Sequence, residues 1–399
     1  MTGPFAWILQ VAAVTRFGLM SIPRRLGAVA ATIVGIAGVV GVLVGVLSIA
    51  EGFKAAMKAS GSDDKAVVLR SGADSEMVSG LDHETTQIIA DAPGVARGSN
   101  GPLSSAELYV MLDLPKRSTG TDANVPLRGV DPTALDVRGN IKILDGRMNA
   151  WGKNELIAGV EAAQEFGGVE VGHTLKVGRS DWLVTGIFSA GGGTAESELW
   201  SDGKLLQAAF DRGDSYQSVY VKLNSAGAYH EFTNSLSSDP RVNVKLARES
   251  EYFSAHSETL TTLINTLGFL IAFLMAIGAV FGALNTMYGA VSARSREIAT
   301  LRALGFGGSA IVVSLMLEAL VLALIGGSIG GGLAYLAFNN FHTSTMNWQS
   351  FSQVAFAFRV TPALLTQGVI WAAAIGLIGG FFPALRAARL PIATALREL

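Results

Sequence analysis

The sequence has no cysteine, which excludes disulfide frameworks, thiolate nucleophiles and cysteine-ligated metal sites. This absence does not tell on which side of a membrane any part of the chain lies. Charged residues make up only 16% of the chain, against about 25% in typical soluble domains. The net charge of −2 argues against nucleic acid as a partner, because nucleic-acid binding needs a clustered basic surface.

Signals for catalysis are also missing. The histidines show neither HxxxH nor HExxH spacing, which argues against a zinc site; they lie at 83, 173, 230, 256 and 342. No G-x-x-x-x-G-K-[ST] phosphate loop is present, so we expect no ATP binding by that route in this chain. Residues 326–330 match G-x-S-x-G by letter, but they lie in an apolar stretch rather than in a strand-turn-helix context. We therefore expect no catalytic, cofactor or metal residues.

Long apolar runs are abundant. Residues 26–50, 259–293 and 360–385 carry no charge, and Glu318 is the only formal charge from 303 to 358. A membrane helix needs about 20 apolar residues to cross roughly 30 Å of hydrocarbon. The first run is too long for the core of a signal peptide, although a cleaved signal is the alternative. We expect transmembrane helices over 26–50, 259–288, 310–337 and 362–386.

Arginines mark one side of these runs. Basic residues accumulate on the cytoplasmic side of bacterial membranes. They flank the first span, the 289–309 loop and the 387–399 tail, whereas the 338–361 loop contains one, Arg359. We therefore expect both termini and the 289–309 loop in the cytoplasm of a bacterial inner-membrane protein. The 338–361 loop and the large segment 51–258 would face the periplasm.

The first 25 residues contain a short apolar stretch, 5–19, that cannot span a bilayer. It reads as an interfacial helix at the lipid headgroups with Trp7 as an anchor, ended by Pro23. A frayed apolar tail is the alternative.

The large segment 51–258 alternates short strand and helix patterns, which predicts an α+β domain. We expect two subdomains: one formed by the flanks 66–95 and 226–246, and an inserted β-rich one over about 100–222. Asp82 is a plausible cap for a helix ending at Ala90. Helical character from about 254 would project the second span outward as a stalk.

Small residues recur at four-residue spacing in the spans and let helix backbones approach closely in lipid. They serve either a dimer interface or packing within one chain, and both readings stay open; the pairs are Gly41 and Gly45, Gly278 and Gly282, and Gly326 and Gly330.

Glu318 lies about nine residues into the third span. An ionisable group at that depth faces the bundle interior. One interpretation is that Glu318 serves as a proton relay or contacts a substrate. The other is that its carboxyl is hydrogen-bonded to a polar neighbour such as Asn285 or Tyr288. We favour the second, because a relay needs further titratable groups in the spans.

The loop between the second and third spans carries a short amphipathic helix at 294–305. Ile298, Leu301 and Leu304 recur on one face, Arg294, Glu297 and Arg302 edge it, and glycines from Gly305 end it. Such a helix lies on the lipid surface or docks in a groove of a soluble partner.

Several motifs resemble the C-terminal part of FtsX-like ABC transporter permeases, a group that includes MacB, LolC, LolE and DevC-type proteins. They are Ser295-Arg-Glu-Ile-Ala-Thr-Leu-Arg-Ala-Leu-Gly305, 317–327, Pro383-Ala-Leu-Arg-Ala-Ala-Arg389 and Ala393-Thr-Ala-Leu-Arg397. The one-plus-three layout of spans is also similar. A weaker likeness to the MacB-type periplasmic domain rests on 127–132, 145–147 and 181–188.

The resemblance implies a dimeric permease, as a homodimer or a heterodimer, paired with two copies of a separate ATPase subunit that holds ATP and magnesium. It implies that the short helix couples to that ATPase through Arg296, Glu297, Ile298, Thr300, Leu301, Arg302, Leu304 and Gly305. Motion transmitted across the membrane would then reshape the outer domain. A periplasmic adaptor and an outer-membrane channel, besides membrane lipids, are further expected partners.

Two functions follow. The first is a permease that exports or extracts a lipid, lipoprotein, glycolipid or peptide. The alternative is an FtsX-like regulator whose outer domain activates a cell-wall hydrolase. The size of the outer segment favours transport, and a membrane-bound enzyme lacks any catalytic constellation.

Overall fold

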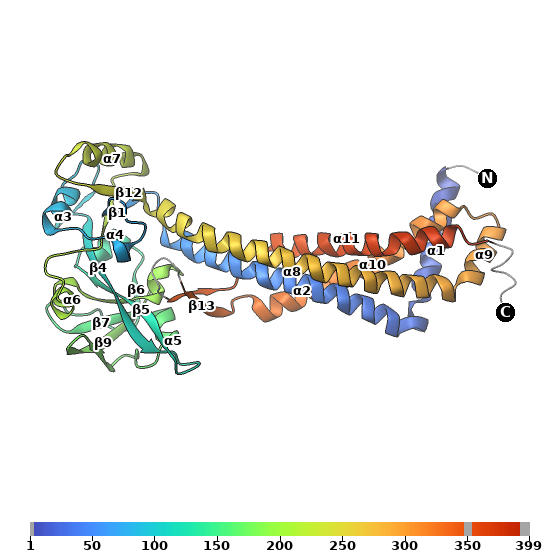
Figure 1. Ribbon diagram of the computed structural model, residues 1–399, viewed down its shortest axis with the longest axis horizontal. Helices are drawn as coiled ribbons and strands as arrows, with labels where there is room; N and C mark the ends of the chain where they lie inside the picture. Colours follow the sequence, from blue (N-terminus) through green and yellow to red (C-terminus); the bar gives the residue numbers. More distant parts are fainter. Residues whose placement is uncertain (1–3, 347–352, 392–399) are drawn as a thin grey trace. The chain divides into compact units, whose positions relative to one another are not determined.

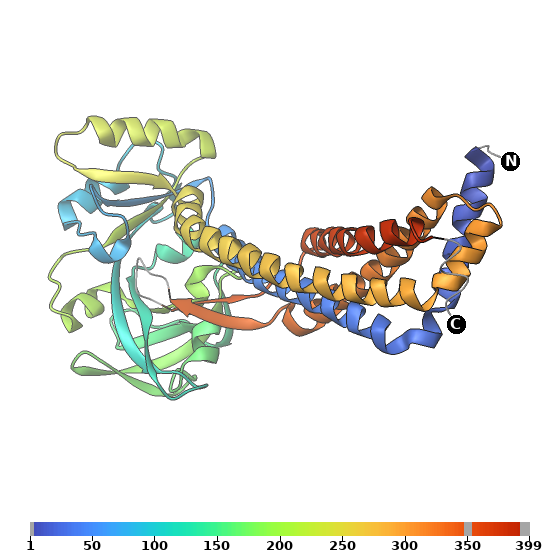
Figure 2. The same ribbon diagram turned by 45° about the vertical axis from the view of Figure 1, so that its right-hand side comes forward.

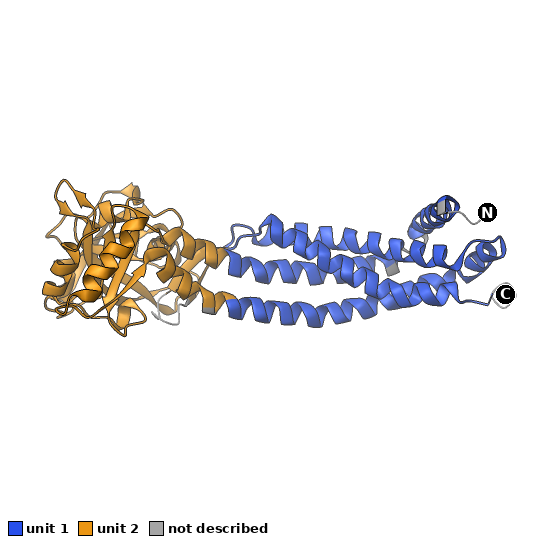
Figure 3. Ribbon diagram, turned by 90° about the horizontal axis from the view of Figure 1, so that it is seen from above, with its two compact units in different colours: residues 1–51, 262–341, 358–399 blue, residues 52–261, 342–357 orange. Residues whose placement is uncertain are grey.

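The computed structural model describes residues 4–346 and 353–391. The motif at 393–397 and most of the expected tail lie outside the described residues. The chain forms two compact units (Figure 3). The helical unit comprises 1–51, 262–341 and 358–399, and the α/β unit comprises 52–261 and 342–357.

Four long helices form the helical unit's bundle (Figure 1). Among the described residues, four helices are long and apolar enough to cross a membrane. Tightly buried aliphatic side chains such as Val40, Leu43 and Val44 fill the bundle core. The sequence-predicted spans all fall within these helices, which are longer at one or both ends: α2 Leu26–Ser60, α8 Glu249–Ala293, α10 Gly308–Phe338 and α11 Pro362–Ala388.

Two short helices lie at one end of this bundle. Helix α1 (Pro4–Met20) runs across the bundle rather than along it, and α9 (Ser295–Ala303) joins α8 to α10 (Figures 1 and 2). At 17 residues α1 is shorter than the roughly 20 apolar residues that a typical membrane span needs. Its position across the bundle end agrees with the predicted interfacial helix. A 3₁₀ turn, η1 (Ile22–Arg25) with Pro23 in it, separates α1 from α2.

The α/β unit is built on one mixed sheet. Its strands follow the order β12-β1-β11-β4-β5-β10-β7-β9-β6, and β8 pairs with β9. Pairing is antiparallel except between β5 and β10 and between β7 and β9. The strands are β1 Lys65–Arg70, β4 Ser104–Pro115, β5 Asp122–Val130, β6 Lys142–Gly146, β7 Glu155–Gly159, β8 Thr174–Val177, β9 Ser180–Ser189, β10 Leu199–Asp202, β11 Ser218–Lys222 and β12 Val244–Arg248, with a separate small pair β2 Arg97–Gly98 and β3 Gly101–Pro102.

Short helices cover this sheet. Helices α3 and α7 pack on the β1-β11-β12 part through Ile89 and Phe232, and α6 packs on β4 and β5 through Leu206. Asp82 caps α3, as its sequence indicates, by accepting a hydrogen bond from the Thr85 amide at 2.7 Å. The helices are α3 His83–Ala90, α4 Ala134–Arg138, α5 Val160–Glu165, α6 Gly203–Ala209 and α7 Tyr229–Ser238, with 3₁₀ turns η2 Glu76–Val78, η3 Thr194–Ser197 and η4 Ala226–Ala228.

Strand β4 joins the two halves of this sheet. Its residues 104–107 pair with β11, and its residues 108–115 pair with β5. Strand β11 falls inside the range expected for the inserted subdomain, yet it pairs with β1 from the flank. The two halves are therefore continuous through β4, and β11 belongs with the flanking strands.

The segment between α10 and α11 contains a β-hairpin. Strands β13 (His342–Met346) and β14 (Gln353–Ala357) pair with each other and pack within the α/β unit. Phe356 meets Phe53 edge-on at 5.4 Å between ring centroids, and the Ala355 amide donates to Ser197 Oγ at 2.9 Å. Sequence reasoning treated this segment only as a loop.

Candidate functional site

Helix α9 presents a polar surface at the end of the bundle. Arg296, Glu297 and Thr300 are exposed, whereas Ile298 and Ala299 are buried. Ile298 packs in a small core with residues of α8, α10 and α11. Glu297 in the first turn and Arg302 in the last turn match the helix dipole. The helix therefore has one buried face and one face open to a partner.

The far end of α9 differs from the predicted pattern. Arg302 Nη1 donates to the Leu390 carbonyl at 2.6 Å, which ties the helix to the segment after α11. The helix ends at Ala303, and Gly305 takes a left-handed conformation with φ of 93°. Leu304 consequently leaves the buried face and is 73% exposed. The expected stripe of Ile298, Leu301 and Leu304 is therefore wrong at Leu304, and Leu301 is only half-buried.

Glu318 of α10 is 1% exposed, and its charged neighbour is Arg294. Arg294 is the residue directly after the end of α8, and its Nη1 lies 3.2 Å from Glu318 Oε2. A Cβ atom at Gly18 would lie 2.5 Å from the same oxygen, so α1 needs glycine there. Sequence reasoning did not name Arg294 as a partner of Glu318, because Arg294 belongs to the segment that follows α8.

The glycine pairs divide into two groups. A Cβ at Gly326 would approach the Ile33 carbonyl at 3.0 Å, and one at Gly330 would collide with the Ala37 backbone. Gly41 faces the Gly330 carbonyl, and a Cβ at Gly45 would meet Phe338 at 2.8 Å. These four glycines therefore let α2 and α10 pack closely.

Gly278 and Gly282 of α8 behave differently, since no atom lies within 4 Å of a Cβ built at either. Among the described residues, therefore, neither glycine is needed for a close contact between helices.

The α/β unit contains a buried group of charges that sequence reasoning missed. We call it the ion cluster; its members are Lys65, Glu76, Glu107, Arg128, Arg138, Glu198 and Glu249.

Arg128 is the centre of this cluster. Its guanidinium lies 2.7 Å from both Glu76 and Glu198 and 2.8 Å from Glu107. Arg138 binds the same Glu107 oxygen at 2.8 Å and stacks on the Tyr220 ring, 3.6 Å from its centroid. Bidentate arginine contacts of this kind fix geometry as well as charge. The cluster thus joins η2, β4, β5 and the strand β10 region.

The cluster also reaches the first residue of α8. Glu249 Oε1 lies 3.5 Å from Arg138 Nη1, and its other oxygen accepts a hydrogen bond from the Ser62 amide at 3.1 Å. Lys65 Nζ lies 3.9 Å from Glu249 and donates to the Arg138 carbonyl at 2.6 Å. Four carboxylates therefore share three cations out of solvent.

Burial and pairing shift these groups in opposite directions. Burial alone would raise the pKa of Glu76, but the charge and hydrogen bonds of Arg128 lower that pKa to about 2. For Glu107 burial outweighs the two arginines and raises its pKa. Burial likewise raises the pKa of Glu249. Glu107 Oε1 has no hydrogen-bond partner among the described residues, which agrees with an incompletely satisfied carboxyl.

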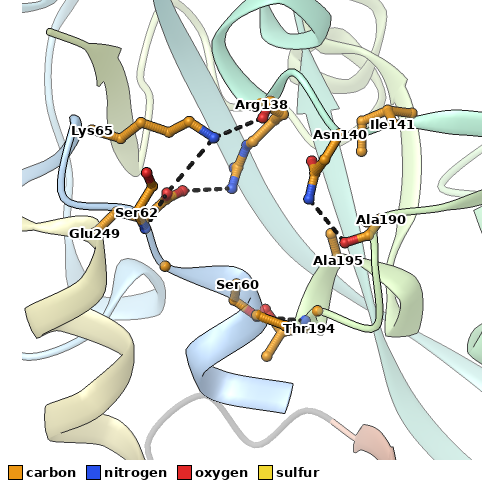
Figure 4. Close-up of a pocket in the computed structure, with 13 residues that line it drawn as sticks. Ser60, Ser62, Lys65, Arg138, Asn140, Ile141, Ala190, Thr194, Ala195 and Glu249 are labelled. Atoms are coloured by element: carbon orange, nitrogen blue, oxygen red, sulfur yellow. Dashed lines mark hydrogen bonds and ion pairs between the residues drawn. The ribbon is translucent and has the colours of Figure 1, made fainter. Parts of the chain in front are cut away.

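A cavity of about 170 Å³ lies beside the cluster (Figure 4). Lys65, Arg138 and Glu249 form one side of it. On another side the Thr194 amide donates to Ser60 Oγ at 2.7 Å, so the C-terminal end of α2 is tied to the segment that follows the three glycines at 191–193. The same picture shows Asn140 pointing to Ala190. The cluster and this cavity thus bring together the ends of α2 and α8.

None of these groups forms a catalytic constellation. Within 4–346 and 353–391, no group of His, Asp or Glu side chains could hold a metal ion. The cluster's carboxylates are engaged by arginines, and it contains no nucleophile with an adjacent base.

A signal for the cluster was present in the sequence. Glu107 and Arg128 interrupt apolar strands. Both are buried, and their side chains lie on the same face of the sheet. A charge inside a buried strand requires a partner. The sequence could not supply the pairing, because Arg128 and Glu76 are 52 positions apart and Glu76 lies in the short 3₁₀ turn η2.

Comparison with known protein families agrees with this architecture. A model of the MacB-like periplasmic core domain matches residues 29–238, and a model of the FtsX-like permease C-terminal region matches 269–392. The first match covers more than half of the chain.

Individual relatives are distant. The chain is 26% identical over 303 residues to the macrolide export ATP-binding/permease protein MacB of Rhodopseudomonas palustris, covering 71% of this chain and 44% of that protein. It is 24% identical over 302 residues to the uncharacterized ABC transporter permease YknZ of Bacillus subtilis, covering 69% and 70%. The chain spans about half the length of the MacB relatives it matches.

A solved structure also matches in part. The periplasmic region of MacB from Actinobacillus actinomycetemcomitans aligns with 52% of this chain and 95% of that one, at 15% identity and a TM-score of 0.36. With both family models matched in sequence order, the chain belongs to the FtsX-like ABC transporter permeases that carry a MacB-like periplasmic core domain.

Proposed function

We propose that this chain is the permease subunit of an ABC transporter and couples ATP hydrolysis in a separate subunit to movement of its α/β unit. The transported substrate would be a lipid, lipoprotein, glycolipid or peptide that is exported or extracted. Relatives of this chain carry names for macrolide export and pyoverdine export. ATP and magnesium would bind to the ATPase, two copies of which would serve a pair of permeases.

One observation carries the proposal. Helix α8 is a single helix of 45 residues. Its first residue, Glu249, belongs to the ion cluster, and the residue after its last, Arg294, binds Glu318 and leads into α9. A continuous helix fixed by buried ion pairs at both ends is suited to transmit displacement. The tie between Ser60 and Thr194 gives α2 a similar attachment at its outer end.

The exposed face of α9 supports a docking role. Arg296, Thr300 and Leu304 are exposed, while the opposite face is held by Ile298 and by the contact of Arg302 with Leu390. Because the buried side of α9 is packed against the bundle, a partner that moves α9 would also move the bundle helices. The arginines beside α1, α9 and the end of α11 favour the cytoplasm for this end of the bundle and the periplasm for the α/β unit.

Co-purification tests the docking role. Leu304→Asp is the variant of choice, because Leu304 is exposed and its replacement leaves the α9 packing intact. A buried charge at a docking contact weakens binding by about 2 kcal/mol or more, or roughly 30-fold. The native chain, purified in mild detergent and analysed by mass spectrometry, should retain an ATPase subunit that Leu304→Asp loses. Stimulated ATP hydrolysis should fall in parallel.

Leu304→Met serves as the matched control, since it keeps an apolar side chain at the same position and should retain the ATPase. Equal retention of the ATPase by Leu304→Asp would contradict docking through α9. Recovery of a cell-wall hydrolase with the native chain, and of no adaptor, would instead favour the regulatory function.

A further inference from the structure

The first 50 residues carry an unbalanced charge. They contain three arginines, at 16, 24 and 25, and no acidic residue. Helix α1 is fixed across the bundle end by polar contacts on one side. Trp7 Nε1 donates to Ser309 Oγ at 3.1 Å, and Thr15 Oγ1 donates to Ser314 Oγ at 3.1 Å.

Beside these contacts, α1 and α10 enclose an open groove of about 610 Å³. Its walls are aliphatic side chains of α1, with Leu317 of α10 opposite them. Thr15 lies in it too, but its hydroxyl is engaged by Ser314. The remaining polar group in the groove is the guanidinium of Arg16. The aliphatic members of α1 include Ile8, Val11, Ala12 and Leu19.

Arg16 is exposed and makes no ion pair or hydrogen bond with any other residue that the structure describes. The acidic residue next to Leu317 is Glu318, which is already paired with Arg294 and packed against Gly18. The groove therefore offers a long apolar surface and one cation that has no counter-ion among the residues that the structure describes. Most of its lining residues belong to α1, the helix that crosses the end of the bundle in Figure 2.

We propose that this groove binds an anionic phospholipid, with an acyl chain along the aliphatic wall and the phosphate against Arg16. A basic pocket between helices at the membrane surface suits an anionic headgroup. An arginine on such a helix extends to the headgroup level while its stem covers apolar surface. A free phosphate would leave the aliphatic wall unused, so the lipid is the occupant that satisfies both features. Bound lipid would fix α1 against α10 beside the Arg294–Glu318 pair.

The test uses the full chain in mild detergent, exchanged with an equimolar mixture of phosphatidylglycerol and phosphatidylcholine and examined by native mass spectrometry. The native chain should retain phosphatidylglycerol preferentially. Arg16→Gln should lower that preference about fivefold, the effect of one basic residue near an anionic surface. Arg16→Lys should keep most of it, since a phosphate accepts a point charge.

A second pair of variants tests the groove itself. Ala12→Trp fills the groove, and Ala13→Trp places the same side chain at an exposed neighbour on the same helix that does not line it. Only Ala12→Trp should release the lipid.

Three outcomes would overturn the proposal: an unchanged lipid ratio in Arg16→Gln, equal loss in both tryptophan variants, or loss of a bound ATPase from Ala12→Trp with the lipid count unchanged. The last outcome would assign the groove to the protein partner.

Discussion

The two ends of α8 are both fixed by buried ion pairs, but in different ways. At the outer end Glu249 enters a cluster of seven charged residues that joins several strands. At the other end Arg294 lies between two carboxylates, 3.2 Å from Glu318 and 3.5 Å from Glu297, and Glu318 is packed against Gly18 of α1. Between them, only 22% of the most apolar segment of α8 is buried, against 44–56% in the other three long helices. The helix is thus fixed near both ends, whereas its most apolar segment is little buried; the proposed lever rests on this arrangement.

The difference between the ends also reflects their surroundings. A water-facing domain can surround buried charges with backbone amides and further side chains. These contacts offset the free-energy cost of removing a large cluster of charges from water. In the hydrocarbon such groups are costly, and small residues take over the packing. In the helical unit, the close contact of α2 with α10 at Gly326 and Gly330 fixes neighbouring elements to each other, as the ion cluster does in the α/β unit.

The largest effect should come from the centre of the cluster. Arg128→Met leaves three buried carboxylates without their shared cation, and removal of one partner of a buried pair costs about 3–5 kcal/mol. Thermal unfolding of the full chain in detergent, followed by tryptophan fluorescence, measures this. The matched control is Arg241→Met, which breaks the exposed pair with Asp239 and should change little. Similar losses of thermal stability in both variants would contradict a larger contribution of the ion cluster than of an exposed ion pair.

A smaller loss should follow from crowding the helices. Gly330→Leu places a side chain against the Ala37 backbone, and overpacking costs about 1–3 kcal/mol. Gly278→Leu adds the same side chain where no atom lies within 4 Å, so the single chain should keep its stability. Size-exclusion chromatography alongside unfolding sharpens the comparison. Loss of a dimer in Gly278→Leu at normal stability would assign that glycine pair to an interface between copies.

Much of this architecture could be predicted from the sequence. Uncharged runs predicted the four long helices, and Asp82 predicted the start of α3. The pattern could not give β6 or the hairpin β13–β14, because β6 is exposed over all five residues and neither has a strong apolar alternation. Long-range partners such as Arg294 for Glu318 required the packing of helices that are adjacent only in space.

Glu318→Gln should have a mild effect at the inner end of α8. Glutamine keeps the shape and an oxygen for Arg294 Nη1, so assembly and most transport activity should remain. The measurement is transport or stimulated ATP hydrolysis of the reconstituted complex, with folding checked by chromatography. Gly18→Val is the harsher companion, because its side chain would displace the Glu318 carboxyl. Loss of transport in a well-folded Glu318→Gln protein would instead indicate a proton relay.

The smallest expected effect is on the pH dependence of stability. Glu76, with a folded pKa of about 2 against an ordinary 4.5, contributes stability that is lost as pH falls through that window. Glu107 acts oppositely: its pKa is raised, so the folded state keeps a proton that the unfolded state loses above 4.5, and stability falls as pH rises. Melting temperature against pH should therefore decline less on the alkaline side in Glu107→Gln. An identical decline in both proteins would assign it to other groups.

The lever itself is tested most directly by a distance measurement. The sequence has no cysteine, so labels can be placed without removing native thiols. Lys54→Cys on α2 and Glu258→Cys on α8 are both exposed positions within the α/β unit. Spin labels at these sites, measured by pulsed electron resonance with the ATPase bound, should report a changed distance when a non-hydrolysable ATP analogue is added, and no change in Leu304→Asp. An unchanged distance in the native chain, or an equal change in Leu304→Asp, would contradict coupling through α9 and α8.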